Sequence, residues 1–268
     1  MLLNRYVRCI ILSIAGICVL VPFLIMVLRA FSGSWFYPDI FPRISFENID
    51  RYFHIDNMRK ALTDSIVLSL LVTFISAILG FLPAKYLGTK KFKGKMALYL
   101  FLLIPAVTPG ICVVFGIVEV LVKLGIYRTY AALLFSQVVF TAPYFIFVMM
   151  PVFKRYDTDM DDQSAILGVS RSSTLFNVTI PAVKSGLASA MMLTFVISWS
   201  MYLVTAATAP IGFQTMATML LTQLGAGYAF DPYVSVMALL FVIPAMISVL
   251  ISTGVVARDR ANSRRGER

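Results

Sequence analysis

The sequence predicts an all-α membrane protein with six transmembrane helices and both termini in the cytoplasm. Apolar residues make up 59% of the 268 positions and charged residues only 13%, which lies far outside the range of soluble domains. A span needs roughly 20 apolar residues to cross a hydrocarbon core of about 30 Å. Six uncharged stretches meet this requirement, and together they predict a single transmembrane domain over 1–268: residues 9–28, 65–84, 96–118, 131–153, 185–210 and 234–257.

The orientation follows from the positions of the 23 Lys and Arg residues. Basic residues near helix ends are retained on the cytoplasmic side of a membrane. With the N-terminus inside, the inner segments hold 16 of them, and the outer segments hold seven, balanced by seven acidic residues. The whole formal charge of +10 then lies inside. We interpret it as topology and attraction to anionic lipid headgroups, not as a nucleic-acid binding surface.

The sequence offers no set of residues for catalysis or for a cofactor. Cys9, Cys18 and Cys112 are widely separated within apolar runs, and His54 is the single histidine, so no metal cluster, disulfide frame or catalytic triad can be assembled. The segment Gly88–Met96 suggests a phosphate-binding loop, but its glycine spacing is wrong for that motif. We predict that the chain is not an enzyme and does not hydrolyse ATP by itself.

The loops and helices can be interpreted in order along the chain. The first outer loop, from Arg29 to about Lys60, is rich in aromatic residues, which either anchor at the lipid interface or form a docking surface for an external partner. The segment Pro105–Gly110 contains two prolines and predicts a kinked, partly opened third helix. The third outer loop, about residues 211–233, has almost no charge and is expected to be half-buried.

Polar residues recur at helical spacing within three spans. In the second span they are small and Gly80 continues their stripe, which favours tight helix packing. In the fourth and fifth spans several are too large for a packing seam, and we interpret these two faces as part of a translocation path. The second-span residues are Ser65, Ser69, Thr73 and Ser76. The path candidates are Gln137, Thr141, Tyr144, Thr194, Ser198, Trp199 and Tyr202, with Thr205 on the same face.

The inner loop 154–184 is the longest patterned polar segment of the chain. A short helix is expected from Asp161 to Leu167, ended by Gly168, and Ser170 is placed to cap a second short helix. Pro181 marks the return to the membrane. The pattern predicts a helix, turn and helix parallel to the membrane, with apolar contacts from Ile166, Leu167, Leu175 and Phe176. An amphipathic linker lying on lipid would show a similar pattern.

This loop resembles the conserved loop of permease subunits of binding-protein-dependent type I ABC importers. That family has Glu-Ala-Ala, three residues, Gly, nine to eleven residues, then an aliphatic residue and Pro. Here Gly168 and Pro181 fit, while Asp162 replaces the Glu and Gln163-Ser164 replaces the two alanines. The six spans and the position of the loop between spans four and five agree with the family as well.

The resemblance implies a mechanism, a set of partners and a location in the bacterial inner membrane. Such a permease pairs with a second permease, which we expect to be a different chain. It binds two cytoplasmic ATPase subunits, which hold ATP and magnesium, and accepts substrate from an extracytoplasmic binding protein. Asp162 would contact an ATPase basic residue and Gly168 would form the turn. The residues that carry the coupling role by position are Asp161, Asp162, Ala165, Leu167, Gly168, Ser170, Phe176 and Pro181.

Within the family, the third and fourth spans resemble the second permease of polyamine, iron, thiamine or phosphonate importers, on Ile104-Pro105, Pro109 and Ala142-Pro143-Tyr144. Polyamine permeases typically carry acids midway along the fifth span, whereas this chain has Ser198–Tyr202 without a carboxylate. The main alternative is an ion-gradient-driven secondary transporter or a channel, which would normally need a charge within the membrane. A membrane-embedded enzyme is disfavoured by the missing catalytic groups.

Overall fold

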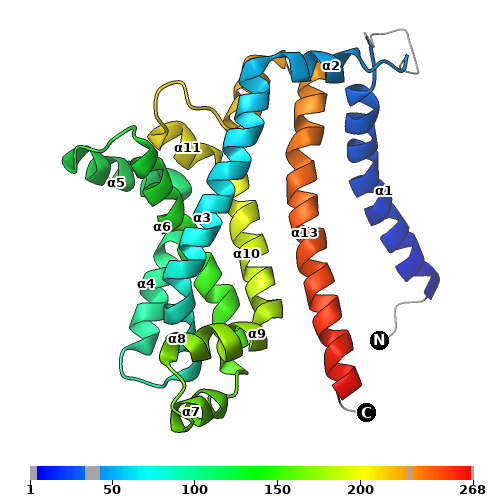
Figure 1. Cartoon of the computed structure of the whole chain (residues 1–268). Helices are drawn as coiled ribbons and strands as arrows, with labels where there is room; N and C mark the ends of the chain where they lie inside the picture. The colour runs from blue at the N-terminus through cyan, green and yellow to red at the C-terminus, as the bar shows by residue number, and fades with distance from the viewer. Residues whose placement is uncertain (1–4, 34–42, 229–230, 267–268) are drawn as a thin grey trace. The chain divides into compact units, whose positions relative to one another are not determined.

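A computed structural model describes residues 5–33, 43–228 and 231–266 of the chain (Figure 1). These residues are largely helical, and the β-type pairing among them is one isolated bridge between Ser32 and Ile44. The chain divides into two compact units, residues 1–62 with 219–243 and residues 63–218 with 244–268. Trp35, Phe36, Tyr37 and Phe41 of the first outer loop, to which we assigned an anchoring or docking role, lie outside the described residues.

The first unit contains α1 (Arg5–Ala30), α2 (Glu47–His54) and the first turns of α3 (Asp56–Thr89). It also holds most of α12 (Met216–Gly225) and the beginning of α13 (Pro232–Gly266). Tyr52 is fully buried and donates a hydrogen bond to the Met58 carbonyl over 3.2 Å. Its ring lies 6.3 Å from that of Tyr233. This aromatic pair joins α2 to α13 within the first unit.

The second unit is built around α6 (Tyr130–Lys154). The helices α4 (Lys95–Val107) and α10 (Lys184–Trp199) pack along it. The helix α3 approaches α6 through Gly80 and Gly88, where even a methyl group would meet Phe145 at 2.7 Å or the Phe153 Cβ at 2.5 Å. Ser65, Ser69, Thr73 and Ser76 are all buried, which confirms the predicted packing stripe of the second span. The helices α3 and α6 therefore pack in close contact within this unit.

Four of the predicted spans are single helices of sufficient length and hydropathy. They lie at Cys9–Ala30, Asn57–Thr89, Tyr130–Lys154 and Pro232–Asp259 of the described chain. The third predicted span instead consists of α4 and α5 (Gly110–Lys123), which meet at 103°. Thr108 is extended, because the proline that follows it disfavours helical backbone, and Pro109 offers no N–H to continue the helix. The predicted kink is confirmed, and it is far sharper than a proline bend within one helix.

The prediction of a continuous fifth span over residues 185–210 is wrong. The helix α10 ends at Trp199, and a separate helix α11 (Tyr202–Thr208) follows. Met201 has φ −79° and ψ 79°, and the Tyr202 N–H donates to the Ser200 carbonyl over 2.9 Å. These values describe an inverse γ-turn, which satisfies backbone groups locally and breaks the helix without proline or glycine.

The third outer loop is partly buried, as its lack of charge predicted. Thr215, Met216, Ala217 and Thr218 are buried in the second unit, and the Met216 N–H donates to the Ser65 hydroxyl over 2.7 Å. A backbone donor is thereby satisfied by a side chain of α3. The cytoplasmic placement of the two termini stays a prediction.

Candidate functional site

The inner loop folds as the predicted helix, turn and helix. Its first helix is α7 (Asp159–Ile166), and Asp157 accepts a hydrogen bond from the Asp159 N–H over 3.0 Å as the helix begins. At the other end Gly168 has φ +75°. The N–H groups of Gly168 and Val169 donate to the carbonyls of Ala165 and Ser164, each over 3.0 Å. This is a complete Schellman motif, in which a residue without Cβ is favoured at Gly168.

The second arm begins at Ser170, as predicted. Its hydroxyl accepts a hydrogen bond from the Ser173 N–H over 3.3 Å and caps α8 (Arg171–Thr174). The short helices η1 (Leu175–Thr179) and α9 (Ile180–Ala182) continue this arm to Val183. The segment Arg171–Ala182 meets α10 at 82°. Such an angle is expected of a segment that lies along the membrane surface below a span.

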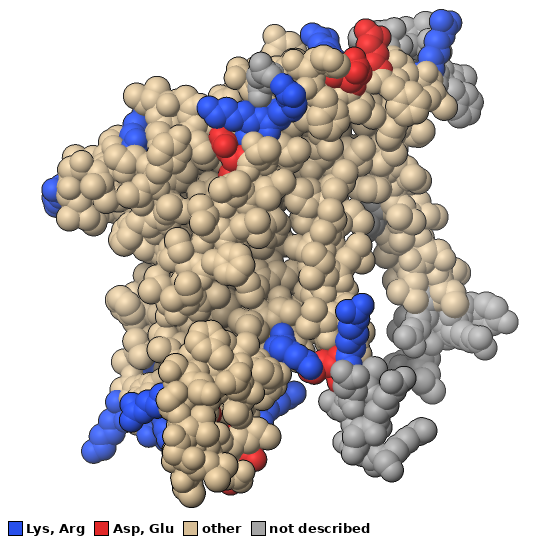
Figure 2. All heavy atoms as spheres, in the orientation of Figure 1, with Lys and Arg blue, Asp and Glu red and all other residues tan. Residues whose placement is uncertain are grey.

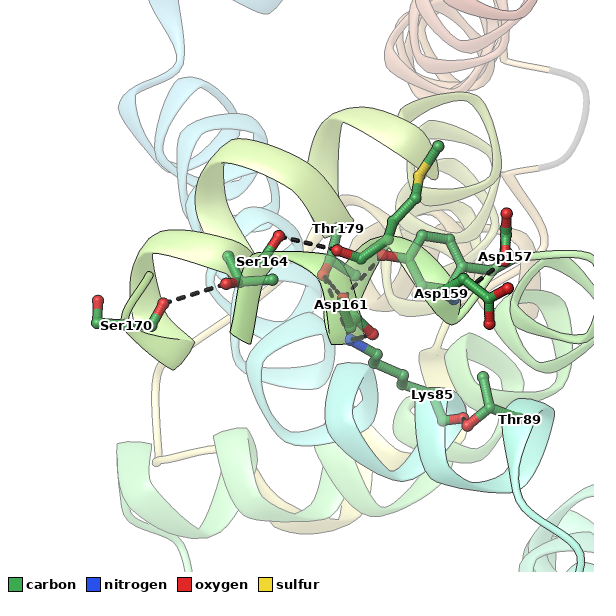
Figure 3. Close-up of polar contacts among 11 residues, drawn as sticks. Lys85, Thr89, Asp157, Asp159, Asp161, Ser164, Ser170 and Thr179 are labelled. Atoms are coloured by element: carbon green, nitrogen blue, oxygen red, sulfur yellow. Dashed lines mark hydrogen bonds and ion pairs between the residues drawn. The ribbon is translucent and has the colours of Figure 1, made fainter. Parts of the chain in front are cut away.

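Asp161 ties the loop to α3 (Figure 3). Its carboxylate lies 2.8 Å from the Lys85 Nζ, and both side chains are only 23% exposed. The hydroxyls of Tyr156 and Thr179 also donate to it, over 2.9 Å and 3.1 Å. Lys85 reaches Thr179 as well, at 3.3 Å. We call Lys85, Tyr156, Asp161 and Thr179 the anchor. It joins α3, the segment that follows α6 and both arms of the loop.

The charge state of the anchor follows from its contacts. Burial alone would raise the pKa of the Asp161 carboxyl, but the hydrogen bonds from Lys85 and Tyr156 and the lysine charge outweigh it and lower the pKa below its usual value. Asp161 therefore remains ionised at neutral pH. In the anchor, two hydroxyls donate hydrogen bonds to the carboxylate of an ion pair. Hydrogen bonds to a charged group are stronger than neutral ones, which stabilises these two partly exposed side chains.

The predicted coupling residues divide into an inward and an outward group. Asp161 faces the anchor, whereas Asp162 beside it is exposed. Ile166 is 85% exposed, Leu167 80% and Phe176 66%. We call these three side chains the apolar tip. The other exposed members of the predicted set are Ala165, Gly168, Ser170 and Pro181.

Three of the seven predicted path residues, Gln137, Thr141 and Ser198, lie in a hydrogen-bonded hub inside the second unit. The Gln137 side chain is fully buried, and its amide donates to the Thr205 hydroxyl over 2.9 Å and accepts from the Ser198 hydroxyl over 2.5 Å. Thr141 donates to the Gln137 carbonyl over 2.9 Å and lies 2.7 Å from the Ser76 hydroxyl. The hub, defined by these five residues, joins α3, α6, α10 and α11.

The remaining path candidates surround the hub. Thr194 is buried and donates to the Ala190 carbonyl over 2.8 Å. Trp199 is buried and stacks on Phe195 with ring centroids 6.0 Å apart. Tyr144 is half-buried, and Tyr202 is exposed at the beginning of α11. In this conformation Gln137 and Trp199 are buried, and the role of the candidate residues in a path stays a prediction.

Comparison with known proteins identifies the family. Residues 76–262, which contain the loop, the anchor and the hub, match the family model described as the binding-protein-dependent transport system inner membrane component. The chain belongs to this family. It is therefore a multi-pass inner-membrane permease subunit of an ABC transporter, and the hydrolysis of ATP belongs to partner ATPase subunits.

Individual relatives agree with the assignment over most of the permease. The inner membrane ABC transporter permease protein YcjP of Escherichia coli is 27% identical over 209 residues, which cover 72% of this chain and 71% of that protein. The spermidine/putrescine permease PotC of E. coli is 20% identical over 92% of both chains. Among solved structures, a bacterial ABC transporter that imports the acidic polysaccharide alginate has a TM-score of 0.73 at 14% identity, over 95% of this chain and 99% of that chain.

Sequence reasoning missed three residues of the permease's anchor, Lys85, Tyr156 and Thr179. Lys85 lies 76 positions before Asp161 in the sequence, and it was counted only as one of many inner basic residues. A possible signal was its position, because it is the first charged residue after a long apolar run and lies on the same helix as the packing stripe. Nothing in its spacing, however, indicates which carboxylate it meets.

Proposed function

We propose that this permease forms half of the translocation pathway of an ABC importer and receives the work of two ATPase subunits through the loop 154–184. A second, different permease would complete the pathway, and an extracytoplasmic binding protein would deliver the substrate. One observation carries this proposal: the loop exposes an apolar tip while the anchor fixes it to α3. An element of this kind can transmit force from a docked partner to the spans.

The apolar tip is the part of the loop that needs a partner. Burying a leucine, isoleucine or phenylalanine side chain contributes about 1.5–3 kcal/mol. Ile166 and Leu167 are adjacent and almost fully exposed, and Phe176 lies on the second arm. Adjacent exposed apolar side chains, such as Ile166 and Leu167, form an apolar patch, and such patches mark sites of interaction. Docking into a groove of an ATPase subunit would bury it, and the exposed Asp162 would pair with a basic residue beside that groove.

The anchor makes the tip useful for coupling. A loop held only at its ends would bend when the ATPase moves, and the movement would be lost. Here Asp161 connects the loop to α3, and α3 is packed closely on α6 at Gly80 and Gly88. We therefore expect α7, α3 and α6 to move together, which switches the spans between inward-facing and outward-facing states.

For the substrate, we propose a small solute of the polyamine-like, phosphonate, thiamine or iron class. The named relatives do not narrow this choice, since spermidine and putrescine are cationic while alginate is acidic. In this chain, the region of Ser198, Trp199 and Tyr202 offers hydroxyls and an indole but no carboxylate. A polyamine would then have to find its acidic partners on the second permease.

Coupling through the tip can be tested by replacing Leu167 with serine. We expect Leu167→Ser to reduce ATPase co-purification by at least tenfold, because it removes about 1.5–3 kcal/mol of apolar burial from the docked loop. Ile211→Ser is the matched control, since Ile211 is an equally exposed apolar residue (86%) on the third outer loop. Equal retention of the ATPase by both variants would contradict the docking of the tip.

Transport itself is tested in proteoliposomes that contain the assembled complex. Uptake should require ATP inside and vanish when the ATPase subunit cannot hydrolyse it. Gly168→Asp and Asp162→Lys should leave the permease in the membrane but uncouple or detach the ATPase. Uptake that follows an ion gradient without ATP would refute an ATP-driven importer.

A further inference from the structure

A groove on the second unit lies beside the anchor and shares Lys85 with it. Its volume is about 710 Å³, and its walls are almost entirely apolar. The last turns of α3 and the first turns of α4 line it, and α6 contributes Ile146 to its wall. Leu82 and Leu98 on its walls are exposed. Since both leucines belong to membrane-spanning segments, the groove opens toward lipid.

One end of this groove carries positive charge. Lys85 and Lys90 line it, and the turn from Lys90 to Lys95 connects its two walls. Phe92 of this turn packs on Tyr86 with ring centroids 5.0 Å apart, which holds the turn against α3. Figure 2 shows Lys and Arg side chains gathered at the end of the molecule where α4 begins. The basic residues are therefore fixed at the mouth of an apolar groove.

Most of this charge is not neutralised within the described parts of the chain. There, Lys85 is paired with Asp161, while no ion pair involves Lys90, Lys91, Lys93 or Lys95. Lys95 donates a hydrogen bond to the Lys90 carbonyl over 3.1 Å, so its ammonium lies close to the end of α3. An apolar groove that ends at unneutralised lysines is complementary to an amphiphile with an anionic head.

We propose that this groove binds one acyl chain of an anionic phospholipid, whose phosphate contacts Lys90 at the groove mouth. The apolar walls would bury the chain, and the lysines would provide the charge complement. A basic residue near an anionic lipid surface contributes about 1 kcal/mol, and basic pockets between spans on the cytoplasmic side are suited to such headgroups. A zwitterionic phospholipid carries the same phosphate, but its ammonium group leaves the head without net charge, so the lysines would favour it less.

Native mass spectrometry of the intact transporter in detergent tests the site, with dioleoyl phosphatidylglycerol as the probe and dioleoyl phosphatidylcholine as its zwitterionic match. We expect retention of phosphatidylglycerol in preference to phosphatidylcholine, about fivefold weaker binding in Lys90→Gln, and no change in Lys91→Gln. Lys91 is a neighbour that is also exposed but does not line the groove. Equal losses in the two variants would show bulk attraction to the basic loop and would overturn the proposal.

A second pair of variants tests the apolar part of the site. Leu98→Trp fills the groove and should abolish the preferred lipid, whereas Leu100→Trp, at an exposed position of α4 outside the groove, should not. Equal retention of the two lipids by the wild type would show ordinary boundary lipid and refute the proposal. Displacement of the lipid by millimolar inorganic phosphate would show an ion site at the lysines and would refute it as well.

Discussion

The anchor and the hub both involve α3, but they join it to its neighbours by different chemistry. The anchor uses a full ion pair between Lys85 and Asp161, at 2.8 Å and partly exposed. The hub uses the neutral amide of Gln137, fully buried between two hydroxyls. A charged side chain costs little free energy at the membrane edge, where water solvates both groups of the pair. Inside the spans a charge costs several kcal/mol, so an amide and hydroxyls form the network instead.

The contrast indicates that two parts of α3 have different roles. Near the end of α3, Lys85 pairs with Asp161 of the loop. Closer to the middle of the part of α3 that belongs to the second unit, Ser76 contacts Thr141 of the hub. Force that arrives at the loop should pass along this helix to the spans. Damage to the anchor should therefore uncouple the ATPase, while damage to the hub should loosen the spans themselves.

The largest effect is expected at the close contact of α3 with α6 at Gly88, because α3 carries residues of both the anchor and the hub. Gly88→Ala would place a Cβ 2.5 Å from the Phe153 Cβ and 2.8 Å from the Met150 carbonyl oxygen. Because this contact involves backbone, α3 and α6 must separate, at a cost of about 3 kcal/mol. The melting temperature of the purified transporter should fall by several degrees. Gly116→Ala, on α5 with open space around it, should have no such effect, and an equal response would contradict the close packing of α3 on α6.

The next effect separates the anchor from the hub. Lys85→Glu would bring two carboxylates together in a partly buried position, and we expect a loss of about 2 kcal/mol in loop docking. ATP-driven uptake should fall at least tenfold, with little change in melting temperature. The exchange Lys85→Asp with Asp161→Lys should recover part of the uptake. An exchange that performs no better than the single variant would show that the pair is not the contact that matters.

A charge reversal at a second ion pair of the chain serves as the comparison for Lys85→Glu. Lys184 pairs with Asp259 over 3.0 Å, but the lysine is 48% exposed. Because exposed pairs contribute about 0–1 kcal/mol, Lys184→Glu should reduce uptake less than Lys85→Glu does.

A smaller effect is expected in the hub. Gln137→Leu would leave Ser198 without its acceptor and Thr205 without its donor, at a cost of about 1 kcal/mol for hydrogen bonds within a membrane bundle. The melting temperature should fall, and ATPase co-purification should be unchanged. Gln214→Leu, at an exposed position, is the control. A change in uptake at an unaltered melting temperature would instead assign Gln137 to the path.

Local signals in the sequence predicted the loop more fully than the spans. Gly168 and Ser170 act through their own conformation and nearest neighbours, so the turn and the cap could be predicted from residue type and spacing. The helix break at Met201 depends on a γ-turn that contains no proline or glycine, so the residue types gave no signal from which to predict it. Pro109 did announce a kink, but not its 103° angle.

Contacts between residues that are distant in the sequence could not be predicted. The hub was identified as a polar face on each of two helices, but not as a closed network, because large polar residues in a span are typical of both packing and paths. The anchor needs α3 and the loop in contact, and only the folded chain brings Lys85 to Asp161. A residue's chemistry was therefore predictable while its partner was not.

The smallest effect is expected from pH, and it tests the charge state of the anchor. The pKa of Asp161 is lowered in the folded protein, so its contribution to stability is present above the ordinary pKa of about 3.9 and is lost only as the pH falls through the lowered value. ATPase co-purification should therefore be constant between about pH 5.5 and 8. Asp161→Asn should weaken it equally across this range. A wild-type loss within the range that Asp161→Asn does not show would mean that the carboxylate gains a proton near neutral pH, and the ion pair could then not be what fixes the loop to α3.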